Sequence, residues 1–175
     1  MTGSKVMPHS VIYTDRLVLR PCAESDLDTL QQIGADDGVR HRLSALLQCS
    51  EMDMAAGLGL WAVQRFSDGP LIGFCGFDRA DRSGEIEMLY RFLPAGWEEG
   101  AAKEACEAAL SYLWTTTAVE RVYARTRREN RKSVAVMERL GMGQLRGGFP
   151  AEAERSLAEN SSIIYVAERP VPLLR

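Results

Sequence analysis

The sequence predicts a single α/β (α+β) domain with a mostly antiparallel sheet in its front half and helix crossovers further on. The first observation is a series of short runs with β-branched or alternating apolar residues between residues 11 and 94. The second is that, from residue 101 onward, runs with helical apolar spacing alternate with further strand-like runs. The third is the length of 175 residues, which is that of about one domain. We expect a flexible N-terminal segment, residues 1–10, followed by one domain over residues 11–170.

The composition is that of an ordinary globular protein and excludes several classes of function. The net charge of −3 gives no general attraction to nucleic acid or to an anionic membrane, and no apolar segment approaches the length of a membrane span. Residues 1–10 lack the apolar run of a signal peptide. The cysteines form no C-x-x-C pair, so neither a zinc site nor a disulfide framework is indicated. We therefore expect a cytoplasmic protein with reduced cysteines, no metal, and no nucleic-acid or membrane partner.

The first predicted elements are a strand at residues 11–20 and a helix at residues 23–35. Alternating and β-branched apolar residues indicate the strand. The helix has apolar residues on one face behind Ser25, which is a candidate N-cap. Residues 39–48 also have helical periodicity, while the Gly- and Met-containing remainder up to residue 58 fits a loop or a short helix.

Three strands are predicted next. Residues 59–66 and 71–79 are joined by Ser-Asp-Gly-Pro, a turn signal typical of a hairpin. The third strand, residues 85–94, ends at Pro94 and alternates between two faces. The apolar face consists of Ile86, Met88, Tyr90 and Phe92. The other face consists of Glu85, Glu87, Leu89 and Arg91.

The loop before the next helix has the sequence GWEEGAAKEA and is rich in small residues. Such a loop can bind an anion, because the free N–H groups of the first helical turn point at it and Gly100 allows close approach. Glu98 and Glu99 fit a second interpretation, a plain helix start in which carboxylates interact with the helix dipole. The spacing matches neither the dinucleotide-binding motif nor the P-loop. The apolar residues from Ala101 onward predict a helix of about four turns.

The last third of the chain contains a concentrated basic block. A predicted strand at residues 121–127 leads into a predicted helix that starts after Asn130 and ends at Gly141, and a final strand is predicted at 162–169. A solvated face is the usual reason for such a charge run. Alternatively, these cations and the backbone of the preceding loop bind the phosphates of one ligand. The block consists of Arg121, Arg125, Arg127, Arg128, Arg131 and Lys132.

Taken together, these segments resemble the GNAT superfamily, and within it the branch of ribosomal-protein alanine N-acetyltransferases. The resemblance runs in unbroken order from about Thr14 to Met142, through TDRLVLRPCAESDLDTL, GLWAV, LIGFCGF, GEIEMLYRFLPAGWEEGAAKEA and RVYARTRRENRKSVAVMERLGM. It implies a mixed, mostly antiparallel sheet of six to seven strands, splayed around an acetyl-CoA site, with helices on both faces.

The resemblance also implies which residues bind acetyl-CoA. The family's Q/R-x-x-G-x-G/A pyrophosphate loop corresponds here to Trp97-x-x-Gly100-x-Ala102, and the family's N-x-x-[AS] contact to Asn130 and Ser133. The backbone after the strand's midpoint lines the pantetheine arm. The expected cofactor-binding residues are Tyr90, Arg91, Phe92, Leu93, Trp97, Glu98, Glu99, Gly100, Ala101, Ala102, Asn130 and Ser133.

Acetyl transfer to an amine needs a base, because an ammonium must lose a proton before its nitrogen can attack. Glu87 matches a family glutamate and is the candidate base, with Glu85 on the same face as the reserve; simple surface alternation is the other interpretation of both. A backbone N–H around Leu89 or Tyr90 would hold the oxyanion. Met137 stands where many relatives have a tyrosine that acts as general acid, so another group, water or nothing takes that role here.

We therefore expect an N-acetyltransferase that transfers the acetyl group of acetyl-CoA directly to a primary amine, without metal. The acceptor is a protein N-terminus or a small amine, and residues 36–58 and 147–160 are expected to select it. A non-catalytic acyl-CoA-binding or regulatory protein with the same fold is the alternative. The sequence is compatible with a monomer or a homodimer.

Overall fold

The computed structural model describes residues 11–26, 28–29, 33, 57–66, 68–79, 85–97, 100–145 and 162–171 of the chain. The strands are β1 (Ile12–Tyr13), β2 (Leu17–Pro21), β3 (Gly59–Arg65), β4 (Leu71–Arg79), β5 (Ile86–Phe92), β6 (Arg121–Arg127), β7 (Gly143–Gln144) and β8 (Ser162–Glu168). The helical elements with described bounds are the 3-10 helices η1 (Glu24–Asp26) and η2 (Pro94–Gly96) and the α-helices α4 (Ala101–Thr116) and α5 (Arg131–Arg139). The predicted flexible segment, residues 1–10, lies outside the described residues.

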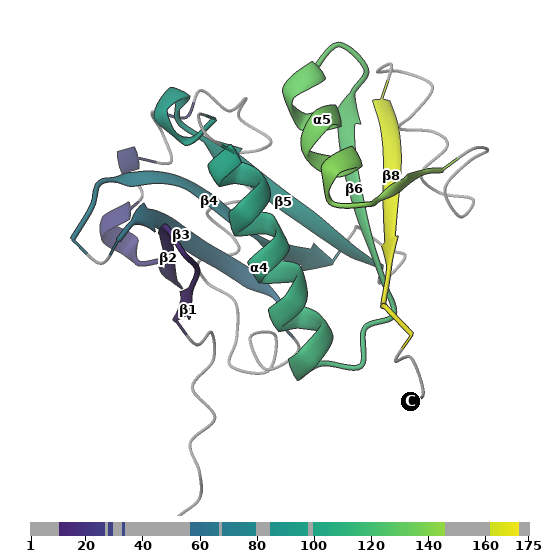
Figure 1. Ribbon diagram of the computed structural model, residues 1–175, viewed down its shortest axis with the longest axis horizontal. Helices are drawn as coiled ribbons and strands as arrows, with labels where there is room; N and C mark the ends of the chain where they lie inside the picture. Colours follow the sequence, from purple (N-terminus) through teal and green to yellow (C-terminus); the bar gives the residue numbers. More distant parts are fainter. Residues whose placement is uncertain are drawn as a thin grey trace, which may run out of the picture.

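The strands form one mixed sheet in the order β1-β2-β3-β4-β5-β6-β8-β7 (Figure 1). All neighbouring strands are antiparallel except β5 and β6, which are parallel and connected through α4. The predicted fold class is therefore confirmed. The sheet has eight strands rather than six to seven, because the first predicted strand is divided in two and because Gly143–Gln144 pairs with β8.

The predicted strand at residues 11–20 is a hairpin of β1 and β2. The Thr14 N–H donates to the carbonyl of Leu17 at 3.0 Å. In return the Leu17 N–H donates to Thr14 Oγ1 at 2.9 Å, which closes a tight turn. A side-chain oxygen that competes with the strand ladder for a backbone donor is the physical reason for the division.

The predicted helix at residues 23–35 begins differently from the expectation. Ser25 lies inside the 3-10 helix η1 rather than at a helical N-cap. The carboxylate of Asp26 accepts the Ala23 N–H at 2.8 Å, and Asp28 and Thr29 are helical. Residues 34–56, which include the predicted helical run at 39–48, lie outside the described residues.

The two predicted faces of β5 are confirmed. Its apolar residues join one large core with α4 and α5, which lie together on one face of the sheet (Figure 1). Trp61 and Phe77 are fully buried in this core. The strand stops at Phe92 because the Leu93 N–H turns to the carbonyl of Ile72, at 2.9 Å, before η2 begins. On the opposite face, Leu60, Ala62 and Phe74 form a second cluster with Cys22, Ile33, Leu71 and Leu89.

The second half of the fold follows the sequence closely. Helix α4 begins at Ala101 as predicted, β6 has the predicted bounds, and α5 starts directly after Asn130. Gly141 ends α5 with a positive φ of 75°, the backbone conformation that favours glycine. Helical spacing, caps and breakers all agree here, so local chemistry determines the elements.

Candidate acetyl-CoA and amine site

The sheet divides between β5 and β6. The parallel ladder joins only two residue pairs, Ile86 with Val122 and Glu87 with Tyr123. Beyond Glu87, no ladder connects the rest of β5 to β6 within the described strands, and the two ribbons diverge (Figure 1). An interior strand with a free edge offers backbone N–H and C=O groups to an extended ligand.

Helix α4 begins beside this division. Its N-cap, Gly100, has φ 76°, and in the described part of the chain no side chain caps the helix start. A Cβ added at Gly100 would meet no described atom within 4 Å, so the approach to the first-turn amides is open. Ala101 and Ala102 are buried against the core. Glu98 and Glu99 lie outside the described residues.

Trp97 fixes the loop that leads into α4. Its indole N–H donates to the carbonyl of Phe92 at 3.0 Å. The two rings also contact edge to face, with their centroids 5.9 Å apart. Trp97 therefore fastens the loop to the end of β5 through the only donor of its side chain. Trp97 stands where the family's pyrophosphate-loop motif has Gln or Arg, and its side chain here holds the loop in place.

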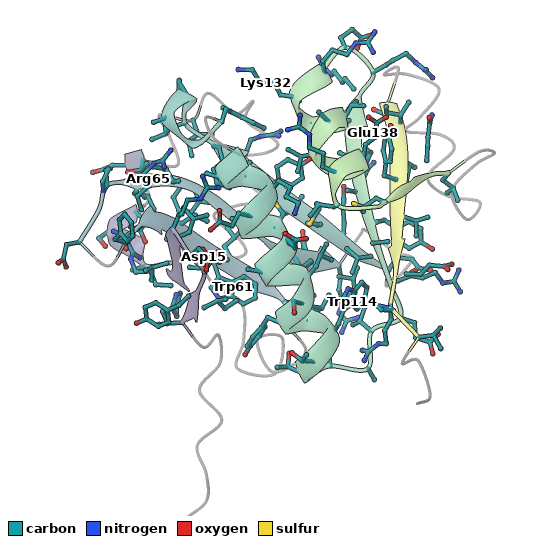
Figure 2. The ribbon with its side chains drawn as sticks, viewed as in Figure 1. Asp15, Trp61, Arg65, Trp114, Lys132 and Glu138 are labelled. Atoms are coloured by element: carbon teal, nitrogen blue, oxygen red, sulfur yellow. The ribbon has the colours of Figure 1, made fainter. Side chains whose placement is uncertain are left out.

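The start of α5 lies close to the same loop. Asn130 Oδ1 accepts the Ser133 N–H at 3.3 Å, which confirms Asn130 as the N-cap. The ammonium of Lys132 is 5.7 Å from the centroid of the Trp97 ring. Lys132 extends from α5 toward the side on which α4 begins (Figure 2). The start of α4, the start of α5 and four exposed cations thus lie at the end of the division where β5 and β6 are no longer paired. These cations are Arg127, Arg128, Arg131 and Lys132.

Tyr90 connects β5 to α5 across the division. Its hydroxyl donates to the carbonyl of Ser133 at 3.2 Å, and both residues are buried. Burial raises the pKa of the Tyr90 phenol, so this group stays protonated and keeps donating. The sequence assigned only the backbone of Tyr90 to the site; its side chain also holds α5 in place.

Glu87 lies on the face opposite α4, at the point where the ladder ends. Its side chain is 5% exposed, so the interpretation as surface alternation fails. Arg125 Nη2 donates to Oε2 at 3.2 Å, and Arg125 Nε donates to Oε1 at 3.4 Å. Glu85 precedes β5 and is half-buried. The sequence placed Arg125 only within the basic block, because its contact with Glu87 depends on the parallel pairing of distant strands.

Four further observations concern the described residues in and around the site. Met137 is buried in the core and has no titratable group, so it cannot act as an acid. Among the described residues, no group of three or more His, Cys, Asp or Glu side chains could hold a metal. Cys22, Cys75 and Cys106 are free thiols. No helix over the described residues is long and apolar enough to cross a bilayer.

The two ends of α4 are held by polar side chains of distant segments. At the first turn, Glu104 accepts from Thr14 Oγ1 at 2.5 Å and from Arg16 Nε at 2.8 Å. Burial raises the pKa of Glu104, but the bonds from Thr14 and Arg16 outweigh burial, and the pKa is lowered. At the last turn, the Arg169 guanidinium donates to the carbonyls of Trp114, Thr117 and Val119.

The fold and its divided sheet define an acetyltransferase domain. A model of the acetyltransferase (GNAT) domain matches residues 16–143, and the chain belongs to the GNAT acetyltransferase family. The uncharacterized N-acetyltransferase p20 of Bacillus licheniformis is 30% identical over 142 residues, which cover 74% of this chain and 80% of that protein. The resemblance to the family and the expectation of an acetyl-CoA-dependent N-acetyltransferase are confirmed.

Solved structures with the same fold act on different acceptors. The ribosomal-protein-S5-alanine acetyltransferase from Vibrio fischeri superposes with a TM-score of 0.66 at 13% identity, covering 92% of this chain and 97% of that one. The spermidine N-acetyltransferase from Vibrio cholerae, in complex with CoA and spermine, gives 0.62 at 16% identity, covering 89% and 97%. At such identities the likeness concerns the fold.

Proposed function

We propose that residues 11–170 form one catalytic domain that binds acetyl-CoA along the free edge of β5. The domain acetylates a primary amine that approaches from the face of the sheet opposite α4. The proposal is carried by the early end of the β5–β6 ladder at Glu87, together with the uncapped helix start that follows the far end of β5. In this family the opening between the two splayed strands is where acetyl-CoA is expected to bind. The free edge of β5 and the open start of α4 are compatible with such a ligand.

The ligand's two chemical parts match two parts of the site. The pantetheine arm has amide groups that suit the backbone of Tyr90, Arg91, Phe92 and Leu93. The pyrophosphate suits the amides from Gly100 to Ala102, with positive charge from Arg127, Arg128, Arg131 and Lys132. In this scheme Trp97, Asn130 and Ser133 fix the loop and the helix start. Glu98 and Glu99 stay predicted neighbours of the phosphates that bind through the backbone.

The proposed chemistry is direct transfer. Bound acetyl-CoA supplies a thioester whose carbonyl carbon forms a bond with the amine nitrogen while the C–S bond breaks. The acceptor ammonium loses two protons overall: one to the base before the attack, and one that ends on the departing thiolate or in water. Glu87 is the proposed base, because it lies where the strands separate, with Glu85 as the reserve. The backbone N–H of Leu89 or Tyr90 is the proposed oxyanion donor.

The acceptor is a protein N-terminus or a small amine, and residues 36–58 and 147–160 are the proposed selectors. Free thiols and the use of acetyl-CoA favour a cytoplasmic location. The proposal includes no metal, nucleic acid or membrane partner, and it fits a monomer or a homodimer.

Thiol release from acetyl-CoA with a panel of N-terminal peptides and polyamines tests the proposed function. We expect amine-dependent release, and an increase in stability on the order of 2–4 kcal/mol with saturating acetyl-CoA. Binding without thiol release by any amine would favour the non-catalytic alternative for this chain. The absence of any melting shift at millimolar acetyl-CoA would remove the proposed site.

A further inference from the structure

We propose that Arg125 is a positioning residue for the amine reaction, which holds the carboxylate of Glu87 in place where the two strands separate. The inference rests on the proposed function, since it assigns a partner to the proposed base. The family resemblance pointed to Glu87 but not to a partner for it. The structure supplies that partner on the neighbouring strand.

The register of β5 and β6 brings the two side chains together. Glu87 is the last residue of β5 in the parallel ladder, and it pairs with Tyr123. Arg125 is two residues further along β6, so its side chain emerges on the same face as those of Tyr123 and Glu87. The strands separate between these positions, and the guanidinium spans the gap with two donors.

The burial of Glu87 explains why its carboxylate needs a partner, and the partner, Arg125, is the more exposed of the two. The side chain of Glu87 is 5% exposed and that of Arg125 is 31% exposed. A carboxylate so deeply buried requires a cation or donors to stay ionised. A bidentate guanidinium occupies two of about four lone-pair positions of a carboxylate. The donor–acceptor distances of 3.2 and 3.4 Å are long for charge-assisted bonds, so the pair orients the carboxylate without binding it tightly.

The charges around Glu87 determine what removal of Arg125 does. The described titratable and charged groups that share its face are Asp78 on β4, Glu85 just before β5, Arg91 on β5, and Arg121, Tyr123 and Arg125 on β6. Asp78 is directly opposite Glu87 in the β4–β5 ladder. Without Arg125, Glu87 faces the carboxylates of Asp78 and Glu85 with less compensation. Its ionised form then becomes less favourable, and the base works only at higher pH.

A double-mutant cycle between Glu87 and Arg125 tests the inference, with kcat, KM and pH profiles as readouts. We expect Arg125→Met to lower kcat at pH 7 by on the order of 10- to 100-fold, while the KM for acetyl-CoA stays within about twofold. The pH of half-maximal kcat/KM should move upward by about one unit, equally for two acceptors with different amine basicity. Arg125→Lys should restore part of the rate, because it returns the charge but not the second donor.

The decisive measurement is the same substitution in the Glu87→Gln background. If Arg125 acts through Glu87, Arg125→Met costs nothing further there. An equal loss in both backgrounds, or an unmoved pH profile, overturns the inference. Arg139→Met removes an exposed arginine on α5 and should match the wild type in every readout. Should Arg125→Met not fold, Arg125→Lys carries the test: it must shift the pH profile in the Glu87 background and change nothing in Glu87→Gln.

The outcomes separate this inference from the proposed function. A wild-type protein that releases no thiol with any amine removes both. A wild-type protein that is active, impaired by Glu87→Gln and unaffected by Arg125→Met keeps the proposed function and removes only the role of Arg125.

Discussion

The two ends of α4 are built in opposite ways. Every helix leaves backbone carbonyls without partners at its C-terminus and N–H groups without partners at its N-terminus. At the C-terminal end, Arg169 donates to the carbonyls of Trp114, of the C-cap Thr117 and of Val119 just beyond the helix. Its guanidinium also lies 5.7 Å from the ring centroid of Trp114, which is labelled in Figure 2. At the N-terminal end, Gly100 provides no side chain, and the described residues provide no cap.

We call the C-terminal end of α4, at Arg169, the closed end and the N-terminal end, at Gly100, the open end. The closed end contributes to stability, whereas the open end is available for a ligand. At the C-terminal, closed end, the carbonyls of Leu113, Trp114 and Thr117 have donors inside the protein, and a cation there complements the helix dipole. The open end keeps its N–H groups available for an anion. The acid in the first turn, Glu104, does not compensate for this, because its oxygens are bonded to Thr14 and Arg16. Variants at the two ends should therefore change different quantities.

The largest effect is expected for Gly100→Asp at the open end. At an effective dielectric constant of 20, two like charges 4 Å apart repel by about 4 kcal/mol, so the Kd for acetyl-CoA should rise by about 100-fold or more. Isothermal titration measures it. Gly141→Asp is the matched control: its φ is 75°, near the 76° of Gly100, and a Cβ there also meets no described atom within 4 Å. It should cost about 1 kcal/mol of stability and leave binding unchanged. Wild-type affinity in Gly100→Asp would reduce the loop to a plain helix start.

At the closed end, Arg169→Ala should lower stability and leave catalysis alone. Several carbonyls lose a charged donor, so we expect a loss of about 2 kcal/mol in the free energy of unfolding, measured by urea denaturation. The KM for acetyl-CoA should not change. Arg169→Lys should recover part of the stability through one donor. A raised KM in Arg169→Ala would contradict the separation of the two ends.

The cations near the open end should have a smaller effect. Neutralising Arg127, Arg128 or Arg131 to Gln should raise the KM for acetyl-CoA a few-fold and leave kcat unchanged, because phosphate contacts act on ground and transition states alike. Added salt should imitate the substitutions through screening. A KM that does not depend on salt would show that the block is only a solvated surface.

The smallest effect concerns Glu104 and pH. Its folded-state pKa is lowered, so it stabilises the fold above its unfolded value of about 4.3, and this contribution disappears as the pH falls through the folded value. At pH 6 the free energy of unfolding of the wild-type protein should exceed that of Glu104→Gln by up to about 1 kcal/mol, and this difference should be smaller at pH 3. Urea titrations at both pH values measure it. A constant difference would show that packing, not charge, ties the first turn to Thr14 and Arg16.

What could be predicted from the sequence depended on how local the determining chemistry is. Helix α5 was predicted well, because Asn130 and Gly141 are caps that act within a few residues. The division of the first strand was missed, because it depends on one hydroxyl, that of Thr14. The contact of Arg125 with Glu87 could not be predicted from sequence spacing, because the two residues are 38 positions apart and only the parallel pairing of β5 with β6 brings them together. The loop role of Trp97 likewise depends on where β5 ends.

The early end of the β5–β6 ladder has a consequence for the lifetime of the protein. A strand in the middle of the sheet carries a free edge, which elsewhere invites pairing with foreign strands. On the proposed function, acetyl-CoA is the part that covers this edge. Amide hydrogens of β5 beyond Glu87 that lie on this free edge, and not those paired with β4, should then exchange slowly only while the coenzyme is abundant. Persistence of the enzyme against proteases and aggregation would thus follow the supply of its own substrate.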